Sequence, residues 1–449
     1  MTQPDTIAAV ATAPGVGGIG VVRISGPGVA QIAVSVIGSL PPARLASYRR
    51  FLDTDGEPID EGIALFFPSP HSFTGDDVLE LQGHGGPVVL DMLLQRVLGL
   101  GARAARPGEF SERAFLNGKL DLARAEAIAD LIHSATETQA RLATRTLRGV
   151  FSRRIDALQQ ALTRLRAFVE AALDFPDEEI DVLADASIHA DLTRLIEDVD
   201  RLHASARQGE LIRDGLVVVI AGAPNAGKSS LLNALAGHDA AIVTPIPGTT
   251  RDLLRTDIQL DGLPLRIIDT AGLRDSDDPI EQEGVRRARA QINAADRLLW
   301  MVDDAVDPPA STLPAADRRP PVPTTLIRNK IDLSQRAPGL VQRGDGITEI
   351  ACSMTTGAGL DLLRAHLKAS AGYLGPESGE FSARRRHLDA LARTSGHLMA
   401  AAAVFRETGA PELMAEDLRQ AQHSLGEITG EFAADDLLGE IFGQFCIGK

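Results

Sequence analysis

The sequence has little of what secreted and membrane proteins contain. Only two cysteines, Cys352 and Cys446, occur in 449 residues, which is too few for a disulfide framework. Residues 1–13 lack a basic segment followed by a long apolar run, so no signal peptide is predicted. The sequence also has no run of about 18 apolar residues, the length that a membrane-spanning helix requires. We therefore expect a reduced, soluble, cytoplasmic protein with no membrane contact.

An excess of positive charge is also missing. The 45 basic side chains are outnumbered by 61 acidic ones, which gives a formal charge of -16. This balance argues against a protein whose whole surface binds nucleic acid, so such a partner would have to meet a local basic patch. No internal repeat or low-complexity tract is present, and the Pro-rich run Pro308–Pro323 predicts a loop.

The texture of the sequence changes along the chain. At about 150 residues per domain, this length would hold roughly two to four domains. Residues 1–118 alternate short apolar runs with Pro- and Gly-rich turns, which predicts a small α/β domain. Residues 119–210 carry apolar side chains at helical spacing and predict long amphipathic helices, the last ending near Gly209. Residues 373–449 return to this pattern, so a helical domain is predicted to be interrupted by a globular insert over residues 211–372.

The insert begins with a phosphate-binding pattern. The apolar run Leu216–Gly222 is followed by Gly227-Lys228-Ser229 and then by the helical run Ser230–Ala236. The pattern G-x-x-x-x-G-K-S between a buried strand and a helix is typical of such sites, because its glycines let backbone N–H groups close around phosphate at a helix N-terminus. Lys228 would neutralise the outer phosphates, and the Ser229 hydroxyl would bind Mg²⁺.

Two downstream motifs favour guanine over adenine. The segment Asp269–Gly272 ends an apolar strand and would supply a carboxylate for Mg²⁺, through water, and a glycine N–H that senses the γ-phosphate. Asn329-Lys330-Ile-Asp332 ends the next apolar strand, and the Asp332 carboxylate can accept hydrogen bonds from guanine N1 and N2. Adenine offers no such pair of donors, so the sequence predicts GTP rather than ATP.

The same region indicates the fold. Asp261-Gly262 joins two apolar runs and predicts a β-hairpin inside an otherwise parallel sheet, as in Ras-like GTPases. We therefore expect a multidomain chain of α/β and α type: a small N-terminal α/β domain, an all-α helical domain, and an inserted Ras-like P-loop G domain with a mixed sheet and flanking helices. The insert resembles the translation-factor-related GTPases, with Gly248–Asp252 as switch I and Ser353–Thr355 as the last base-contacting loop. That family usually has Ser-Ala-Lys in this loop, so Met354 and Thr355 depart from its pattern.

The predicted GTP-binding residues come from all five motifs. They are Asn225, Ala226, Gly227, Lys228, Ser229, Ser230, Thr244, Pro245, Ile246, Pro247, Gly248, Thr249, Thr250, Asp269, Thr270, Ala271, Gly272, Asn329, Lys330, Asp332, Ser353, Met354 and Thr355. Ser229 and Thr250 are the expected Mg²⁺ ligands.

This sequence lacks a group that Ras-like GTPases use to hydrolyse GTP. Leu273 occupies the place of the Gln that orients the attacking water, and the nearby arginines Arg274, Arg286 and Arg287 suit surface positions. One hypothesis is that K⁺ supplies the missing positive charge and Glu281 polarises the water through a second water. Asn225 with Gly248–Asp252 resembles potassium-stimulated GTPases that are activated when two G domains meet. The expected K⁺ ligands are Asn225 and the backbone around Thr244, Ile246 and Thr249, and the expected catalytic residues are Glu281, Lys228 and Thr250.

Along nearly its whole length the chain resembles the MnmE (TrmE) family of bacterial tRNA modification GTPases. Besides the GTPase motifs, four segments carry the resemblance in the expected order: Pro14–Gly26, Phe73–Gly86, Arg106–Lys119 and Phe445–Lys449. The resemblance implies that residues 1–118 bind a 5-formyl-tetrahydrofolate or related one-carbon folate and form a homodimer. It also implies an FAD-dependent partner, MnmG (GidA), in a heterotetramer-type complex that adds a carboxymethylaminomethyl or aminomethyl group to uridine C5 at the tRNA wobble position. The folate contacts it implies fall on Arg23, Glu80, Lys119 and Lys449.

Other patterns have simpler interpretations. Gly15–Gly20 fits G-x-G-x-x-G, but a strand follows it, so turn glycines are favoured over a dinucleotide site. Cys446 could be a nucleophile or a buried small apolar group beside Phe442 and Phe445, and Cys352 is taken as structural. For His84 a turn or capping role is favoured over metal binding. A regulatory or ribosome-assembly GTPase is the alternative function, and the folate residues favour tRNA modification over it.

Overall fold

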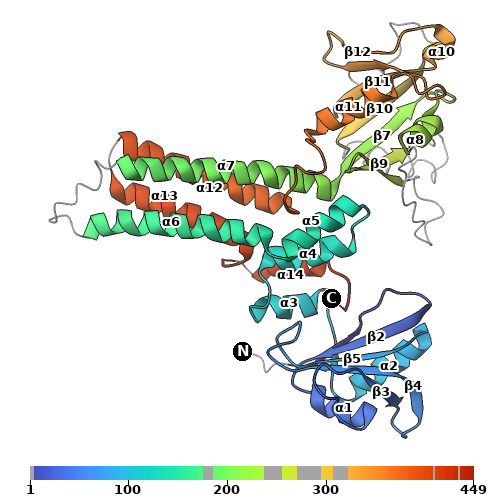
Figure 1. Cartoon of the computed structure of the whole chain (residues 1–449), viewed down its shortest axis with the longest axis vertical. Helices are drawn as coiled ribbons and strands as arrows, with labels where there is room; N and C mark the ends of the chain where they lie inside the picture. Colours follow the sequence, from blue (N-terminus) through green and yellow to red (C-terminus); the bar gives the residue numbers. More distant parts are fainter. Residues whose placement is uncertain are drawn as a thin grey trace, which may run out of the picture. The chain divides into compact units, whose positions relative to one another are not determined.

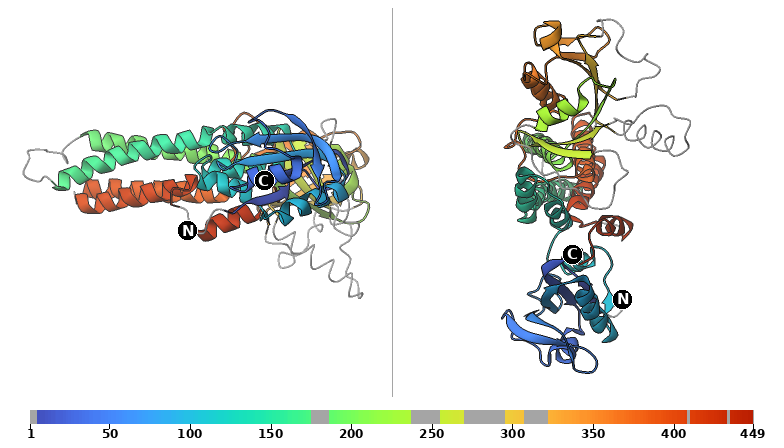
Figure 2. Two further views of the ribbon diagram at one scale, coloured as in Figure 1. Left: turned by 90° about the horizontal axis from the view of Figure 1, so that it is seen from below. Right: turned by 90° about the vertical axis from the view of Figure 1, so that its right-hand side faces the viewer.

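The computed structural model describes residues 5–174, 186–236, 255–269, 295–306, 322–407, 410–432 and 435–448 (Figures 1 and 2). The chain divides into two compact units, one of Met1–Ile132, Thr146–Ile196 and Arg393–Lys449, and one of His133–Arg145 and Glu197–Ala392. The predicted boundaries at 118, 210 and 372 are finer than this division and stay predictions. Among the described helices, none combines the length and the apolar character needed to cross a membrane.

The N-terminal part is a six-stranded sheet covered by two helices. The strands are β1 (Ile7–Val10), β2 (Gly17–Ser25), β3 (Ser47–Leu52), β4 (Pro58–Phe67), β5 (Val78–Gly85) and β6 (Arg103–Ala104), in the order β3-β4-β5-β2-β1-β6. Side chains alternate between the two faces of each strand. Leu79 and Leu81 of β5 are therefore fully buried in the core with α1 (Val29–Ile37) and α2 (Pro87–Gly99), whereas Glu80 lies on the opposite face. The predicted small α/β domain is confirmed.

Long helices follow, as their apolar spacing predicts. They are α3 (Glu109–Leu116), α4 (Leu122–Ile132), α5 (Glu137–Leu147), α6 (Val150–Asp174), α7 (Ala186–Asp214), α12 (Arg385–Glu407), α13 (Pro411–Thr429) and α14 (Asp435–Gly443). Figures 1 and 2 show α6 lying along α13, and the apolar stripe of α6 from Ile155 to Val169 is buried.

One predicted helix end was wrong. The last helix before the insert continues past Gly209 to Asp214. Gly209 does not end the helix but allows a close approach, because a Cβ there would lie 2.1 Å from the Phe381 carbonyl oxygen. The terminating glycine is Gly215, which has φ 72 and donates its N–H to Leu211 O at 2.9 Å. Left-handed glycines of this kind are common at helix C-termini.

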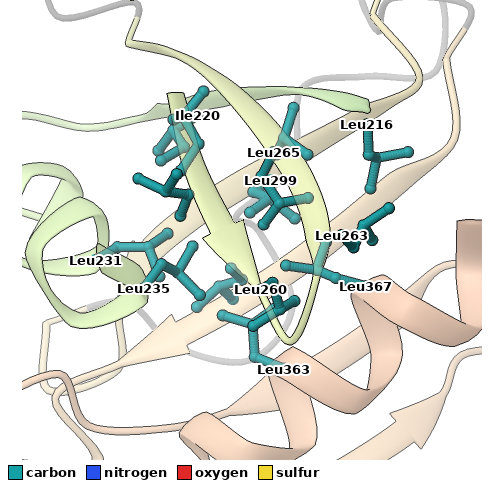
Figure 3. Close-up of a cluster of buried hydrophobic side chains, with 14 of the residues drawn as sticks. Leu216, Ile220, Leu231, Leu235, Leu260, Leu263, Leu265, Leu299, Leu363 and Leu367 are labelled. Atoms are coloured by element: carbon teal, nitrogen blue, oxygen red, sulfur yellow. The ribbon is translucent and has the colours of Figure 1, made fainter. Parts of the chain in front are cut away.

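The insert is built around a seven-stranded sheet. Its strands are β7 (Leu216–Gly222), β8 (Arg255–Leu260), β9 (Leu263–Asp269), β10 (Arg297–Asp303), β11 (Thr324–Asn329), β12 (Gly339–Gln342) and β13 (Thr348–Ala351), in the order β12-β13-β11-β10-β7-β9-β8. Leucines of the sheet pack against α8 (Lys228–Ala236) and α11 (Leu360–Ala371), as Figure 3 shows. Trp300, the single tryptophan of the chain, lies on β10 and packs beside Val302 and Leu326.

The hairpin prediction is confirmed, but the sheet has a second antiparallel edge. β8 pairs antiparallel with β9, and its turn residues Asp261 and Gly262 have φ 51 and 91, the left-handed values of a type I′ turn. The five strands β7, β9, β10, β11 and β13 are parallel, whereas β12 pairs antiparallel with β13. The expectation of an otherwise parallel sheet was therefore incomplete.

A buried carboxylate holds the start of α3. The side chain of Glu109 is 4% exposed and accepts hydrogen bonds from both terminal nitrogens of Arg103, at 3.0 and 2.6 Å, and from the backbone N–H of Arg106 at 2.8 Å. Burial alone would raise the pKa of Glu109, but these hydrogen bonds and the charges of Arg103 and Arg113 leave its pKa below the usual value. The ionised form is therefore favoured by folding.

We expect Glu109→Gln to lower the stability of the chain at neutral pH by about 1–3 kcal/mol, the cost of weakening hydrogen bonds to charged groups. Because the pKa of Glu109 is depressed in the folded state, its contribution is present above the unfolded pKa and is lost as the pH falls through the folded pKa. Thermal unfolding from pH 7 downward should therefore show a difference between wild type and variant that shrinks in acid. Glu112→Gln, on the same helix, is the control, and a constant difference across pH would refute the role of the Glu109 charge.

Candidate functional site

Several predicted nucleotide-binding residues lie together at the carboxyl ends of the parallel strands. β7 ends at Gly222, β9 at Asp269 and β11 at Asn329, and Ser353 follows two residues after β13. Ligands of open α/β sheets bind at this edge. The predicted order of strand, glycine-rich loop and helix is confirmed, since α8 begins at Lys228.

The loop between β7 and α8 depends on backbone conformations that favour glycine. Gly222 and Gly227 have φ 146 and 100, and Asn225 between them has φ 63. A Cβ at Gly222 would lie 2.2 Å from the Met301 carbonyl oxygen, and one at Gly227 would lie 2.2 Å from Asn329 Nδ2. Both glycines therefore bring the loop close to neighbouring strands, where a larger residue would not fit.

Lys228 lies back over this loop. Its Nζ donates hydrogen bonds to Gly222 O at 2.9 Å and Ala223 O at 3.0 Å, and no described carboxylate pairs with it. An ammonium bonded only to neutral carbonyl groups keeps its charge available for an anionic ligand. Ser229 follows it in the first turn of α8, where it is exposed.

Asn329 joins two loops to the end of β11. Its side chain is almost fully buried, its Nδ2 donates to Ala226 O at 2.8 Å, and its Oδ1 accepts from the backbone N–H of Met354 at 3.1 Å. The phosphate loop and the segment 353–355 are thus attached to the end of β11 through one carboxamide. Met354 takes part through its backbone, so its departure from the usual Ser-Ala-Lys sequence leaves this contact intact.

The segment predicted to read the base is held partly by Asp303, which the sequence did not single out. Lys330 has φ 66 and donates from Nζ to Asp303 Oδ2 at 2.6 Å. Asp332 lies in the short helix α10 (Ile331–Ser334) and is exposed. Ser353 is buried, and its Oγ accepts from the backbone N–H of Thr356 at 3.2 Å, so it closes a turn. Asp303 could not be predicted from sequence, because its partner Lys330 directly follows the adjacent strand β11 and is distant in sequence.

Several predicted residues lie outside the described part of the chain. These are Thr244, Pro245, Ile246, Pro247, Gly248, Thr249, Thr250, Thr270, Ala271, Gly272, Glu281 and Lys449. The predicted switch I, the K⁺ ligands other than Asn225, and the hydrolytic glutamate therefore stay predictions.

A second group of predicted residues meets in the N-terminal part. Arg23 of β2 is paired in register with Glu80 of β5, and its Nε and Nη2 both lie 2.9 Å from Glu80 Oε1. Nη1 of Arg23 donates to Gly448 O at 3.2 Å, and the guanidinium carbon lies 5.8 and 5.7 Å from the ring centroids of Phe73 and Phe110. Arg23, Glu80 and the C-terminal segment are thus brought together.

Lys119 has a different environment. Its Nζ donates to the Pro70 carbonyl oxygen at 2.7 Å, and no described contact links it to Arg23 or Glu80. The prediction that Lys119 belongs to the same site stays a prediction.

Two of the simpler interpretations need correction. Cys446 is exposed, which contradicts the buried apolar alternative and leaves the nucleophile alternative a prediction; the rings of Phe442 and Phe445, with centroids 5.4 Å apart, fill the core without it. His84 lies in strand β5 rather than in a turn, and its Nδ1 is hydrogen-bonded to Asp60 Oδ1 at 2.8 Å. This hydrogen bond to the Asp60 carboxylate raises the pKa of His84 above its ordinary value.

The other simple interpretations concern glycines, Cys352 and metal binding. Gly17 to Gly20 lie in strand β2, which disfavours a dinucleotide site. Cys352 is fully buried, and burial raises the pKa of its thiol to about 12, which suits a structural residue. The described residues contain no cluster of three or more His, Cys, Asp or Glu side chains that could hold a metal ion.

Comparison with known proteins identifies the family to which the chain is similar. Residues 6–119 match the family described as GTP-binding protein TrmE N-terminus, and residues 122–446 match the MnmE helical domain. The chain is 58% identical over 450 residues to the tRNA modification GTPase MnmE of Pseudomonas aeruginosa strain UCBPP-PA14, and equally to that of Pseudomonas paraeruginosa, with 99% of both chains covered in each case. The G domain of the FeoB iron transporter of T. maritima is 24% identical with a TM-score of 0.27, covering 35% of this chain and 98% of that one. The family assignment rests on the sequence matches.

We expect Asn329→Ala to weaken GDP binding about 10- to 100-fold, because it leaves the Ala226 carbonyl and the Met354 N–H without their buried partners. Calorimetric titration of the purified chain measures this effect. Asn233→Ala is the matched control, since Asn233 is an exposed asparagine on α8. Unchanged affinity in Asn329→Ala would show that the two loops hold their arrangement without the carboxamide.

Proposed function

The chain belongs to the MnmE family of tRNA modification GTPases, and from this premise we propose that it binds and hydrolyses GTP at the edge of the seven-stranded sheet to drive wobble-uridine modification. Support comes from the 58% identity over 99% of the chain and from the connected site around Asn329. The hydrogen bond from Asn329 to the phosphate loop supports the proposal most directly, because it connects the proposed base-reading motif to the proposed phosphate-binding loop.

In this proposal the nucleotide is held at both ends. Backbone N–H groups of the loop and the Lys228 ammonium bind the phosphates, and Asp332 accepts hydrogen bonds from guanine N1 and N2. The Ser229 hydroxyl, exposed at the start of α8, fits a Mg²⁺ ion beside the phosphates, with Thr250 as the second protein ligand. When bound, Mg²⁺ neutralises charge on the phosphate oxygens.

We propose further that K⁺ supports hydrolysis. Asn225 has φ 63 at the exposed rim of the phosphate loop, so its side-chain oxygen is available to a cation. The resemblance adds the backbone around Thr244, Ile246 and Thr249 as ligands, Glu281 as the residue that polarises water, and contact between two G domains as the activating event.

The N-terminal part is proposed to bind a one-carbon folate, 5-formyl-tetrahydrofolate or a relative. Glu80 Oε1 accepts from Nε and Nη2 of Arg23, whereas among the described residues Oε2 accepts only from the Gln82 amide, at 3.3 Å. Oε2 therefore retains capacity to accept from the amide and amino edge of a pterin ring. Arg23, Lys119 and Lys449 would supply cations to the formyl oxygen or the glutamate tail.

The assembly proposed with this chemistry is a homodimer in a heterotetramer-type complex with FAD-dependent MnmG. It would act on cytoplasmic tRNA and add a carboxymethylaminomethyl or aminomethyl group to uridine C5. A ribosome-assembly GTPase is the alternative, and the Arg23–Glu80 pair beside Gly448 favours tRNA modification, because an assembly GTPase has no evident use for it.

Nucleoside analysis of tRNA tests the function. A strain without this protein should lose its modified wobble uridines, wild type should restore them, and Lys228→Ala should fail because the phosphate loop loses its cation. Asn233→Ala should restore them. Wobble uridines that stay modified in the deletion strain would support the assembly alternative.

Potassium dependence gives a second test. We expect GTP turnover to be about tenfold or more faster in KCl than in NaCl at equal ionic strength, a modest effect beside the roughly 10³- to 10⁵-fold effect of an arginine finger. Asn225→Ala should remove the difference and Asn233→Ala should keep it. Equal turnover of wild type in the two salts would rule out the K⁺ site.

A further inference from the structure

The short helix α10, which carries the proposed base-reading residue Asp332, is not stable by itself. α10 spans only Ile331–Ser334, too few residues for a helix to be stable by itself. It is bracketed by Lys330 with φ 66 and Gln335 with φ 55, left-handed conformations that are strained for residues other than glycine. The orientation of Asp332 must therefore be imposed by contacts outside α10.

Two consecutive carboxylates, at the last residue of β10 and the residue after it, provide these contacts. Asp303 accepts from Lys330 Nζ at 2.6 Å, directly before α10. Asp304 binds the other end: its Oδ2 accepts from Ser334 Oγ at 2.6 Å and lies 3.0 Å from Arg336 Nε. The backbone N–H of Asp304 also donates to Asn329 O at 2.9 Å. Asp304 thus contacts the chain on both sides of Asp332.

Asp304 is itself fixed by a buried charge. Its side chain is 3% exposed, and its Oδ1 lies 3.4 Å from Nη1 of Arg328, whose side chain is 1% exposed. Arg328 Nε donates to Glu349 Oε1 of β13 at 2.7 Å, and Arg336 and Arg343 also approach Glu349, each at 3.5 Å. Buried charges are costly unless they are paired, so Arg328 holds Asp304 in one place.

We propose that Asp304 is a positioning residue for guanine recognition. By binding Ser334 and Arg336 while anchored to Arg328, it fixes α10 so that both oxygens of Asp332 face the base. It acts on the base through α10, without touching it. The inference rests on the proposed GTP site and deepens it, because it assigns base selectivity partly to a residue outside the GTPase motifs.

Selectivity between two related bases gives a readout that a purely structural role would not change. Guanine offers Asp332 two donors, N1–H and the N2 amino group, whereas hypoxanthine offers only N1–H. A misplaced Asp332 would therefore weaken GDP binding more than IDP binding. We expect Asp304→Ala to weaken GDP binding about tenfold or more and to lower the preference for GDP over IDP severalfold, in line with hydrogen bonds to a charged acceptor.

The experiment measures GDP, IDP and ADP affinities of the full chain by calorimetry in Mg²⁺ buffer. Asp345→Asn is the matched control, because Asp345 is a nearby carboxylate that pairs with Arg343 at 3.6 Å and has no described contact with α10. Ser334→Ala removes only the hydroxyl and should shift the preference in the same direction by less, so a test remains if Asp304→Ala fails to fold. In an Asp332→Ala background, Asp304→Ala should cause no further loss of the GDP preference.

The outcomes separate the inference from the proposed function. A reduced GDP preference in Asp304→Ala and Ser334→Ala, with Asp345→Asn unchanged, supports the inference. Equal weakening of GDP and IDP, or an effect that persists without Asp332, overturns it and leaves Asp304 as a support of the sheet. A wild-type chain that binds ADP as tightly as GDP overturns the proposed function and the inference with it.

Discussion

The proposed nucleotide site depends on the two hydrogen bonds of the Asn329 carboxamide. This carboxamide is one of few side-chain groups that donate and accept at once, and both capacities are used on backbone atoms of separate loops. Neither loop belongs to a helix or strand at these positions, and the Asn329 side chain ties both loops to the end of β11. The contact also requires glycine at position 227, because any side chain there would displace Asn329.

Several buried or half-buried ion pairs lie next to irregular segments of the chain and restrict their conformation. Arg328 with Asp304 and Glu349 lies beneath the base-reading segment, Glu109 with Arg103 lies at the start of α3, and Arg23 with Glu80 lies beside Gly448. Such pairs add little net stability compared with apolar packing, but removing one partner leaves a charge in a poor environment. They therefore favour one conformation of the segment strongly over the alternative conformations.

Much of the fold could be predicted because its signals are local. The run Leu216–Gly222 with the glycines after it, and the turn at Asp261-Gly262, specify strand, loop and hairpin within a few residues. The misses depend on packing between distant segments. In the sequence Gly209 suggests a helix end, but its role is to allow the close approach of the Phe381 backbone. Cys446 is exposed because the rings of Phe442 and Phe445 fill the neighbouring core. The contacts of Asp303 and Asp304 could not be found because strand order decides which residues meet.

The single tryptophan has a practical consequence. Trp300 lies on β10, in the middle of the seven-stranded sheet and among apolar neighbours from the adjoining strand. Its fluorescence therefore reports on the inserted domain alone, without a contribution from the helices or from the N-terminal sheet. Emission spectra recorded during denaturant titration would follow the loss of this one domain, whereas far-ultraviolet circular dichroism would follow mainly the helices, so the two optical signals can resolve separate unfolding steps without any label.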